Sequence, residues 1–64
     1  MRKKVYEIVE TIEADGWRLE KQKGNHQQYK HPVKAGKVTV PYHGRNAELD
    51  HDLVSSILKQ AGLR

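Results

Sequence analysis

A strand bounded by a glycine turn and a proline occupies the middle of the chain, in the sequence Gly24-Asn25-His26-Gln27-Gln28-Tyr29-Lys30-His31-Pro32. Glycine and asparagine tolerate the positive φ angles of tight turns, and proline ends a strand because it has no N–H for a neighbouring strand. Side chains of a strand alternate between two faces. Tyr29 is the one large apolar side chain of this segment, so we expect its face to pack on the core. His26, Gln28 and Lys30 then lie on the opposite, open face.

The segment before this turn has the same two-residue period. Trp17 and Leu19 alternate with polar residues, which predicts a half-buried strand whose polar side faces water. The segment after it, residues 37–41, predicts a third strand with Val38 and Val40 pointing inward. The open face of the predicted sheet therefore carries Arg18, Glu20, Gln22, His26, Gln28, Lys30, Lys37 and Thr39.

A helix is predicted on each side of the three strands. The first has an apolar stripe spaced i, i+3, i+4 and i+7, with Lys3 and Lys4 on its solvent-exposed face and Gly16 at its end. That stripe consists of Val5, Ile8, Val9 and Ile12. The second helix follows an unpatterned loop, residues 43–48, and its expected apolar stripe consists of Leu53, Ile57, Leu58 and Ala61.

Asp50 is the predicted N-cap of the second helix, with Leu49 and Val54 placed to form a hydrophobic staple. The order of elements is helix, three strands, helix. This order predicts an α+β fold in which a three-stranded antiparallel sheet has both helices on one face and the other face free. A chain of 64 residues has room for one small core, so we expect a single domain over residues 1–64.

The charge of the chain is concentrated in its centre. The net charge is +4, but residues 17–45 contain seven basic residues and a single acid, Glu20, which gives this region +6. A basic region between more acidic flanks suggests a surface for a polyanion such as a phosphate-bearing partner. A solvated surface that keeps a small protein soluble explains the charge excess equally well.

Composition narrows the cofactors and the cellular location. The chain has no cysteine, and its four histidines follow no recognised metal-ligand spacing, so neither a disulfide nor a metal site is expected. Its basic N-terminus is not followed by the apolar run of a signal peptide, and no segment is long enough to span a membrane. We therefore expect a cytoplasmic protein without a membrane partner and without a cofactor.

The expected open face offers chemistry suited to RNA. His26 is the only group on it whose ordinary pKa lies near neutrality, so it can take a proton from a ribose 2′-hydroxyl. That oxygen would attack the adjacent phosphodiester, while Lys30 or Lys37 offsets the developing negative charge. Arg18, Lys30 and Lys37 can also bind phosphates, and Gln28 can contact a sugar or a base. This route requires no metal ion.

Five segments of the chain match a known family. They are Asp15-Gly16-Trp17, Gly24-Asn25-His26, Tyr29-Lys30-His31-Pro32, Val38-Thr39-Val40-Pro41 and Ser56-Ile57-Leu58-Lys59-Gln60-Ala61-Gly62-Leu63. In this order and at this spacing, over essentially the whole chain, they resemble the HicA toxins of bacterial toxin–antitoxin systems.

The resemblance implies a fold like that of double-stranded-RNA-binding domains, an mRNA endonuclease activity and neutralisation by a HicB-like antitoxin in a toxin–antitoxin hetero-oligomer. The family's catalytic histidine maps onto His26. Asn25 stands where the family usually has serine, and keeps a short polar side chain in the turn. The segment Tyr42–Leu49 has fewer cations than the corresponding loop of the family.

Two functions of different classes fit these residues. One is a metal-independent ribonuclease that uses His26. The other is a non-catalytic RNA-binding module, because this topology commonly recognises duplex RNA by shape and backbone contacts. We expect His31 to pack or hydrogen-bond at the end of its strand, and we give His43 and His51 no catalytic role. Aromatic stacking on bases is not expected, because Trp17 and Tyr29 belong to the predicted core.

Overall fold

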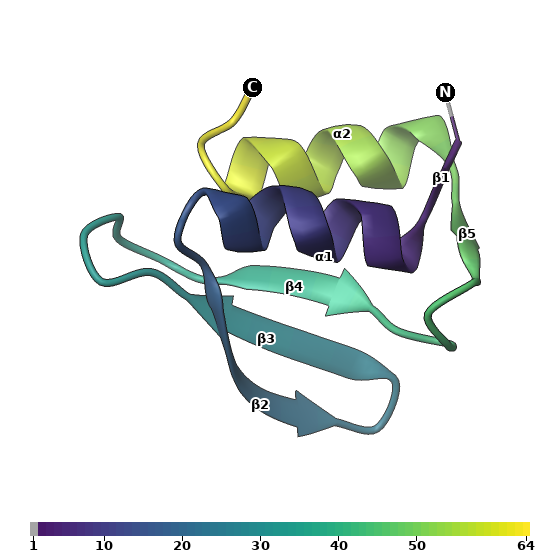
Figure 1. Ribbon diagram of the computed structural model, residues 1–64, viewed down its shortest axis with the longest axis horizontal. Coiled ribbons are helices and arrows are strands. Elements are labelled where there is room, and N and C mark those ends of the chain that lie inside the picture. Colours follow the sequence, from purple (N-terminus) through teal and green to yellow (C-terminus); the bar gives the residue numbers. More distant parts are fainter. Residues whose placement is uncertain (1) are drawn as a thin grey trace.

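The computed structural model describes residues 2–64 and has the expected α+β architecture (Figure 1). Its elements in chain order are β1 (Lys3–Lys4), α1 (Val5–Ala14), β2 (Arg18–Lys23), β3 (His26–Lys30), β4 (Val38–Pro41), β5 (Glu48–Leu49) and α2 (His51–Gln60). Strands β2, β3 and β4 form an antiparallel sheet in that order, and the two helices lie side by side along one side of it (Figure 1). The predicted sheet and helix order are confirmed. Neither helix is long and apolar enough to cross a membrane.

The core lies between the two helices and strands β3 and β4. Trp17, Tyr29, Val38 and Val40 are all buried, as their positions in the two-residue period predicted. The helices contribute their apolar stripes to the same cluster, which contains Val5, Ile8, Ile12, Leu49, Val54, Ile57 and Ala61. The face of the sheet that carries Tyr29 is therefore the packed face, and the opposite face is open.

Strand β2 is not half-buried, which corrects the expectation for this segment. Every residue from Arg18 to Lys23 is exposed, and Leu19 is 47% exposed although it is paired with the buried Tyr29. The physical reason is the width of the helical layer, which covers β3 and β4 while β2 extends beyond it as an edge strand (Figure 1). Burial ends at Trp17, immediately before the strand.

A bulge in β2 corrects the expected position of Gln22. Leu19 pairs with Tyr29, but the next pair is Lys21 with Gln28, so Glu20 is an extra residue in the strand. One inserted residue reverses the alternation of all the residues that follow it. Gln22 consequently pairs with the buried Gln27 on the packed side and accepts a hydrogen bond from its amide at 3.2 Å.

The start of the chain also differs from the expectation. Lys3 and Lys4 form the short strand β1, which pairs antiparallel with β5, instead of extending the first helix. The first N–H groups of an α-helix have no partner within the helix. Here the N–H of Val5 donates to the carbonyl of Ala47 at 2.9 Å, and that of Tyr6 to the carbonyl of Arg45 at 3.0 Å. The loop before α2 thus completes the N-terminus of α1.

The predicted N-cap of α2 is confirmed. Asp50 accepts a hydrogen bond from the backbone N–H of Leu53 at 2.9 Å, and both staple residues, Leu49 and Val54, are buried. The expected place of Leu53 in the apolar stripe is wrong, because its side chain is 39% exposed. Val54 takes the buried place in the first turn instead, while Ile57 and Ala61 are buried as expected.

Candidate nucleic-acid interface

The face of the sheet opposite the helices presents its side chains in three rows across the strands. Residues opposite each other in an antiparallel pair lie on the same face, so the register defines the rows. The first row is Lys23, His26 and Pro41, the second is Lys21, Gln28 and Thr39, and the third is Arg18 and Lys30. We call these residues, with Lys37 and Glu20, the open face. Rows two residues apart along a strand are about 7 Å apart.

His26 lies at the edge of the open face, directly after the turn that joins β2 to β3. Gly24 has a φ of 58° and Asn25 does not have a positive φ, the pattern of a type II′ turn. The carbonyl of Asn25 accepts a hydrogen bond from the N–H of Tyr42, which holds this turn against the end of β4. His26 is exposed and is the first residue of β3. Its imidazole is therefore accessible to a large ligand.

Gln28 lies in the middle row and is half-buried between Lys21 and Thr39. Its Oε1 is a buried side-chain oxygen with no hydrogen-bond donor among residues 2–64. An unpaired buried acceptor costs about 1–3 kcal/mol, which a donor from a ligand would recover. This oxygen is a candidate acceptor for a hydroxyl or amino group.

The third row lies about 13 Å from His26, because His26 and Lys30 are four residues apart on one strand. Lys37 immediately precedes Val38, the partner of Tyr29, and so lies at the same end as Lys30. Lys30 forms an ion pair with Glu20 at 3.3 Å. The structure thus gathers Lys30 and Lys37 at one end of the open face and separates them from His26.

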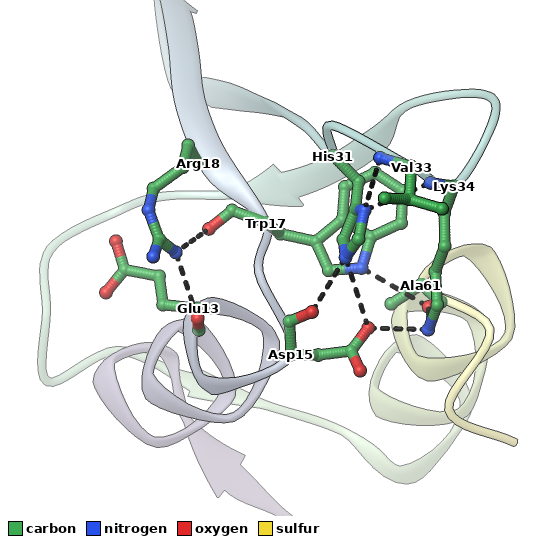
Figure 2. Close-up of polar contacts among 8 residues, drawn as sticks. All are labelled: Glu13, Asp15, Trp17, Arg18, His31, Val33, Lys34 and Ala61. Carbon is green, nitrogen blue, oxygen red and sulfur yellow. Dashed lines mark hydrogen bonds and ion pairs between the residues drawn. The ribbon is translucent and has the colours of Figure 1, made fainter.

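The Arg18 guanidinium turns toward the end of α1. It donates hydrogen bonds to the carbonyls of Glu13 and Trp17, both at 2.9 Å (Figure 2). A cation at this position stabilises the negative end of the helix dipole. Arg18 is exposed, so it can still contact a ligand at the third row, but it lies remote from His26.

The residue pattern missed two cations, Lys21 and Lys23. Neither was among the residues expected on the open face, and the register places them in the rows of Gln28 and His26. The two-residue period alone could not locate them, because it changes at Glu20, but a two-residue turn at Gly24 and Asn25 predicts the pairing of Lys23 with His26. With these two lysines the open face has basic residues along its whole length.

Comparison with known families fits this arrangement. A family model described as the HicA toxin of bacterial toxin–antitoxin systems matches residues 5–63. The chain belongs to the HicA toxin family. This membership makes it a toxin of a toxin–antitoxin system, and it agrees with the resemblance carried by the sequence segments. No curated protein matches the chain.

A second polar cluster of this HicA chain lies around His31, where the α1–β2 turn meets the loop after β3 (Figure 2). The Nδ1 atom of His31 accepts hydrogen bonds from the N–H groups of Val33 and Lys34, both at 3.0 Å. Because Nδ1 is an acceptor, the proton of the neutral ring is on Nε2, which donates to the carbonyl of Asp15 at 2.7 Å. The ring therefore packs and hydrogen-bonds, as expected for His31.

Lys34 joins this cluster to the C-terminus of α2. Its ammonium pairs with the Asp15 carboxylate and donates to the carbonyl of Ala61 at 3.0 Å (Figure 2). The same carbonyl accepts the indole N–H of Trp17 at 3.3 Å. The hydrogen bond from Lys34 lowers the pKa of Asp15 below its usual 3.8, although burial opposes this shift. Every group here has a structural partner, so the cluster is a structural tie between three segments.

Proposed function

We propose that this HicA chain is a metal-independent mRNA endonuclease that uses His26 as its catalytic group. The observation that carries the proposal is the position of His26, which is exposed at the edge of a basic open face. His31, by contrast, is fixed by three hydrogen bonds, and His43 and His51 are exposed outside the three-stranded sheet. His26 is the histidine that combines access to RNA with neighbouring cations.

The reaction follows from the chemistry of RNA. The neutral imidazole of His26 takes the proton of a ribose 2′-hydroxyl, and the 2′-oxygen attacks the adjacent phosphorus. The new bond from phosphorus to the 2′-oxygen forms as the bond to the 5′-oxygen breaks. The products are a 2′,3′-cyclic phosphate and a 5′-hydroxyl, whose oxygen takes its proton from solvent. A deoxyribose in place of the attacking ribose removes the nucleophile and prevents the reaction.

The RNA contacts we propose are Gln28, Lys30, Lys37 and Arg18. Lys30 and Lys37 would bind a phosphate at the third row, and Arg18 would contact the same end of the strand. Phosphate contacts position RNA without reading its sequence. Gln28 Oε1, a buried oxygen with no donor in the described chain, would accept a hydrogen bond from a sugar hydroxyl or a base.

The protein partner we propose is a HicB-like antitoxin, in a toxin–antitoxin hetero-oligomer formed in the cytoplasm. Membership of a toxin family supports the pairing. The charge of the open face indicates where and how such a partner would bind, since a basic surface favours an acidic surface on the antitoxin. An antitoxin seated there would block access to His26.

The test compares His26→Ala with a matched change at another exposed histidine, His43→Ala. We expect His26→Ala to lose RNA cleavage and growth arrest in a host cell, while its melting temperature and RNA affinity change little. His43→Ala should keep both activities. Cleavage should persist in EDTA, because no metal takes part.

Full cleavage and toxicity in His26→Ala would overturn the catalytic assignment. RNA binding without cleavage by the wild-type protein would instead identify the chain as a non-catalytic RNA-binding module. Loss of cleavage in EDTA, restored by a divalent ion, would replace the proposed route with a metal-dependent one.

A further inference from the structure

Lys23 is the cross-strand neighbour of His26. The two residues pair across the turn formed by Gly24 and Asn25, and they close the hairpin between β2 and β3. Directly paired residues have Cβ atoms about 5 Å apart and share one face of the sheet. The long side chain of Lys23 can therefore bring its ammonium group to any ligand atom held against the His26 ring.

The partner of His26 on its other side cannot supply a cation. On the β4 side its partner is Pro41, which has no polar side-chain atom. The cations of the third row lie about 13 Å away along the strand, and one of them, Lys30, is already paired with Glu20. Lys23 makes no ion pair with any of residues 2–64. Lys21, in the second row, is a diagonal neighbour of His26 at about 7–8 Å, so Lys23 is the cation directly opposite the proposed catalytic histidine.

We propose that Lys23 binds the scissile phosphate and stabilises its charge in the transition state. This inference rests on the proposed ribonuclease function. As the 2′-oxygen bonds to phosphorus, negative charge increases on the two non-bridging oxygens. The protonated ammonium of Lys23 donates a hydrogen bond to one of them and stays protonated throughout, while His26 handles the proton of the 2′-hydroxyl.

The two-residue turn of Gly24 and Asn25 sets the pairing of Lys23 with His26, and the bulge at Glu20 lets Leu19 at the start of the strand pair with Tyr29 on the other face. Lys21 and Lys23 thus lie on the open face. Lys23 and the cations of the third row then bind different phosphates of the RNA. Lys23 contacts the phosphate at the cut site, and the third row contacts a phosphate farther along the same RNA strand.

The test measures cleavage of an RNA oligonucleotide that has one cut site, with kcat and KM determined separately. Removal of one donor to a developing oxyanion lowers kcat by about 100-fold, which is the loss expected for Lys23→Met, with KM changed less than about threefold. Lys30→Met should mainly raise KM, because a remote phosphate contact is equally strong in the ground and transition states. Lys59→Met, on the exposed surface of α2, serves as the unchanged control.

A sulfur substitution in the substrate separates a direct contact from a structural effect. Replacing one non-bridging oxygen of the scissile phosphate by sulfur weakens a hydrogen bond from an ammonium group. The wild-type protein should lose rate with one of the two phosphorothioate diastereomers, and Lys23→Met should not distinguish them. Lys23→Arg should restore much of kcat, because it returns the charge and the donor.

The outcomes separate this inference from the function on which it rests. If His26→Ala cleaves RNA normally, the proposed function fails and the role of Lys23 with it. If His26→Ala is inactive but Lys23→Met keeps kcat within about threefold, the inference alone is overturned. A folded Lys23→Met with a raised KM and an unchanged sulfur effect would also overturn it.

Discussion

The indole of Trp17 and the imidazole of His31 meet edge to face, with their ring centroids 5.2 Å apart and their planes at 67°. Trp17 is fully buried and His31 covers it from the loop side, with only 10% of its side chain exposed. The histidines at the two ends of β3, His26 at its start and His31 directly after it, therefore have opposite environments. His31 is part of the packing around the core, whereas His26 is free at the open face.

Removal of the His31 ring should destabilise the protein. His31→Ala would uncover Trp17 and leave the N–H groups of Val33 and Lys34 without their acceptor. Lost packing and unpaired donors together predict a decrease of about 2–4 kcal/mol in the free energy of unfolding. Urea denaturation measures this change, and the exposed His51→Ala should stay within about 0.5 kcal/mol of wild type. RNA cleavage below the melting transition should survive in His31→Ala, so its loss there would contradict a purely structural role.

Gly16 is required by close approach as well as by its backbone angle. Its φ is 110°, and a Cβ added there would lie 2.6 Å from Nε2 of His31. The ring cannot move away without losing its hydrogen bonds, so Gly16→Ala should be strongly destabilising. Gly36→Ala is the matched control, because its φ is 87° but no atom lies within 4 Å of the added Cβ.

We expect Gly36→Ala to lose about 1–2 kcal/mol from backbone strain alone, and Gly16→Ala to lose at least about 1 kcal/mol more. Thermal and urea denaturation of both variants measure the difference. Equal losses would show that the approach of His31 to Gly16 has no energetic consequence.

The ion pair between Asp15 and Lys34 predicts a loss of stability in acid. The hydrogen bond from Lys34 lowers the pKa of Asp15 in the folded protein below its usual 3.8. The unfolded state therefore binds the proton first, and the stabilisation is complete above about pH 3.8 and lost as the pH falls through the lower, folded-state pKa. The measurement is the free energy of unfolding between pH 6 and the lowest accessible pH, for wild type and Asp15→Asn.

The difference in the free energy of unfolding between wild type and Asp15→Asn should become smaller as the pH falls. The contributions of the other carboxylates are present in both proteins and cancel in this difference. Lys34→Met should show the same weaker acid dependence as Asp15→Asn. A constant gap at all pH values would contradict the ion pair as the source of the shift.

The periodicity of apolar residues correctly predicted the segments in which buried and solvent-exposed side chains follow a regular helical or strand pattern. The stripe of α1, the inward valines of β4 and the burial of Trp17 and Tyr29 all follow from the apolar pattern. The cap at Asp50 follows from residue type and the position of the helix start. These features depend on neighbours within one segment, and the sequence contains that information directly.

The predictions from the sequence were wrong where contacts with distant segments determine burial or strand pairing. Leu19 belongs to the apolar alternation but is exposed, because the helices are too narrow to reach β2. The pairing of β1 with β5 joins two segments that have no strand pattern of their own. The bulge at Glu20 arises from pairing with β3, and the register shows that Lys23, and not Gln22, shares the face of His26.

The buried phenol of Tyr29 predicts a loss of stability in alkali. Burial raises its pKa to about 12, and the charge of Glu13 acts in the same direction. The hydroxyl donates to Oε1 of Gln27 at 2.8 Å. Above the usual pKa of 10.0 the unfolded chain gives up this proton while the folded protein retains it, so the stability tied to the neutral phenol is lost as the pH rises toward 12.

Tyr29→Phe removes this titration. At neutral pH it should lower the free energy of unfolding by about 1 kcal/mol, because Gln27 loses its donor. Its deficit relative to wild type should shrink between about pH 10 and 12, since the phenylalanine has no proton to lose. Urea denaturation across that range measures the deficit. If the Tyr29→Phe deficit is the same at neutral and alkaline pH, the phenol of Tyr29 titrates alike in the folded and unfolded chains, and its burial does not govern the alkaline limit of stability.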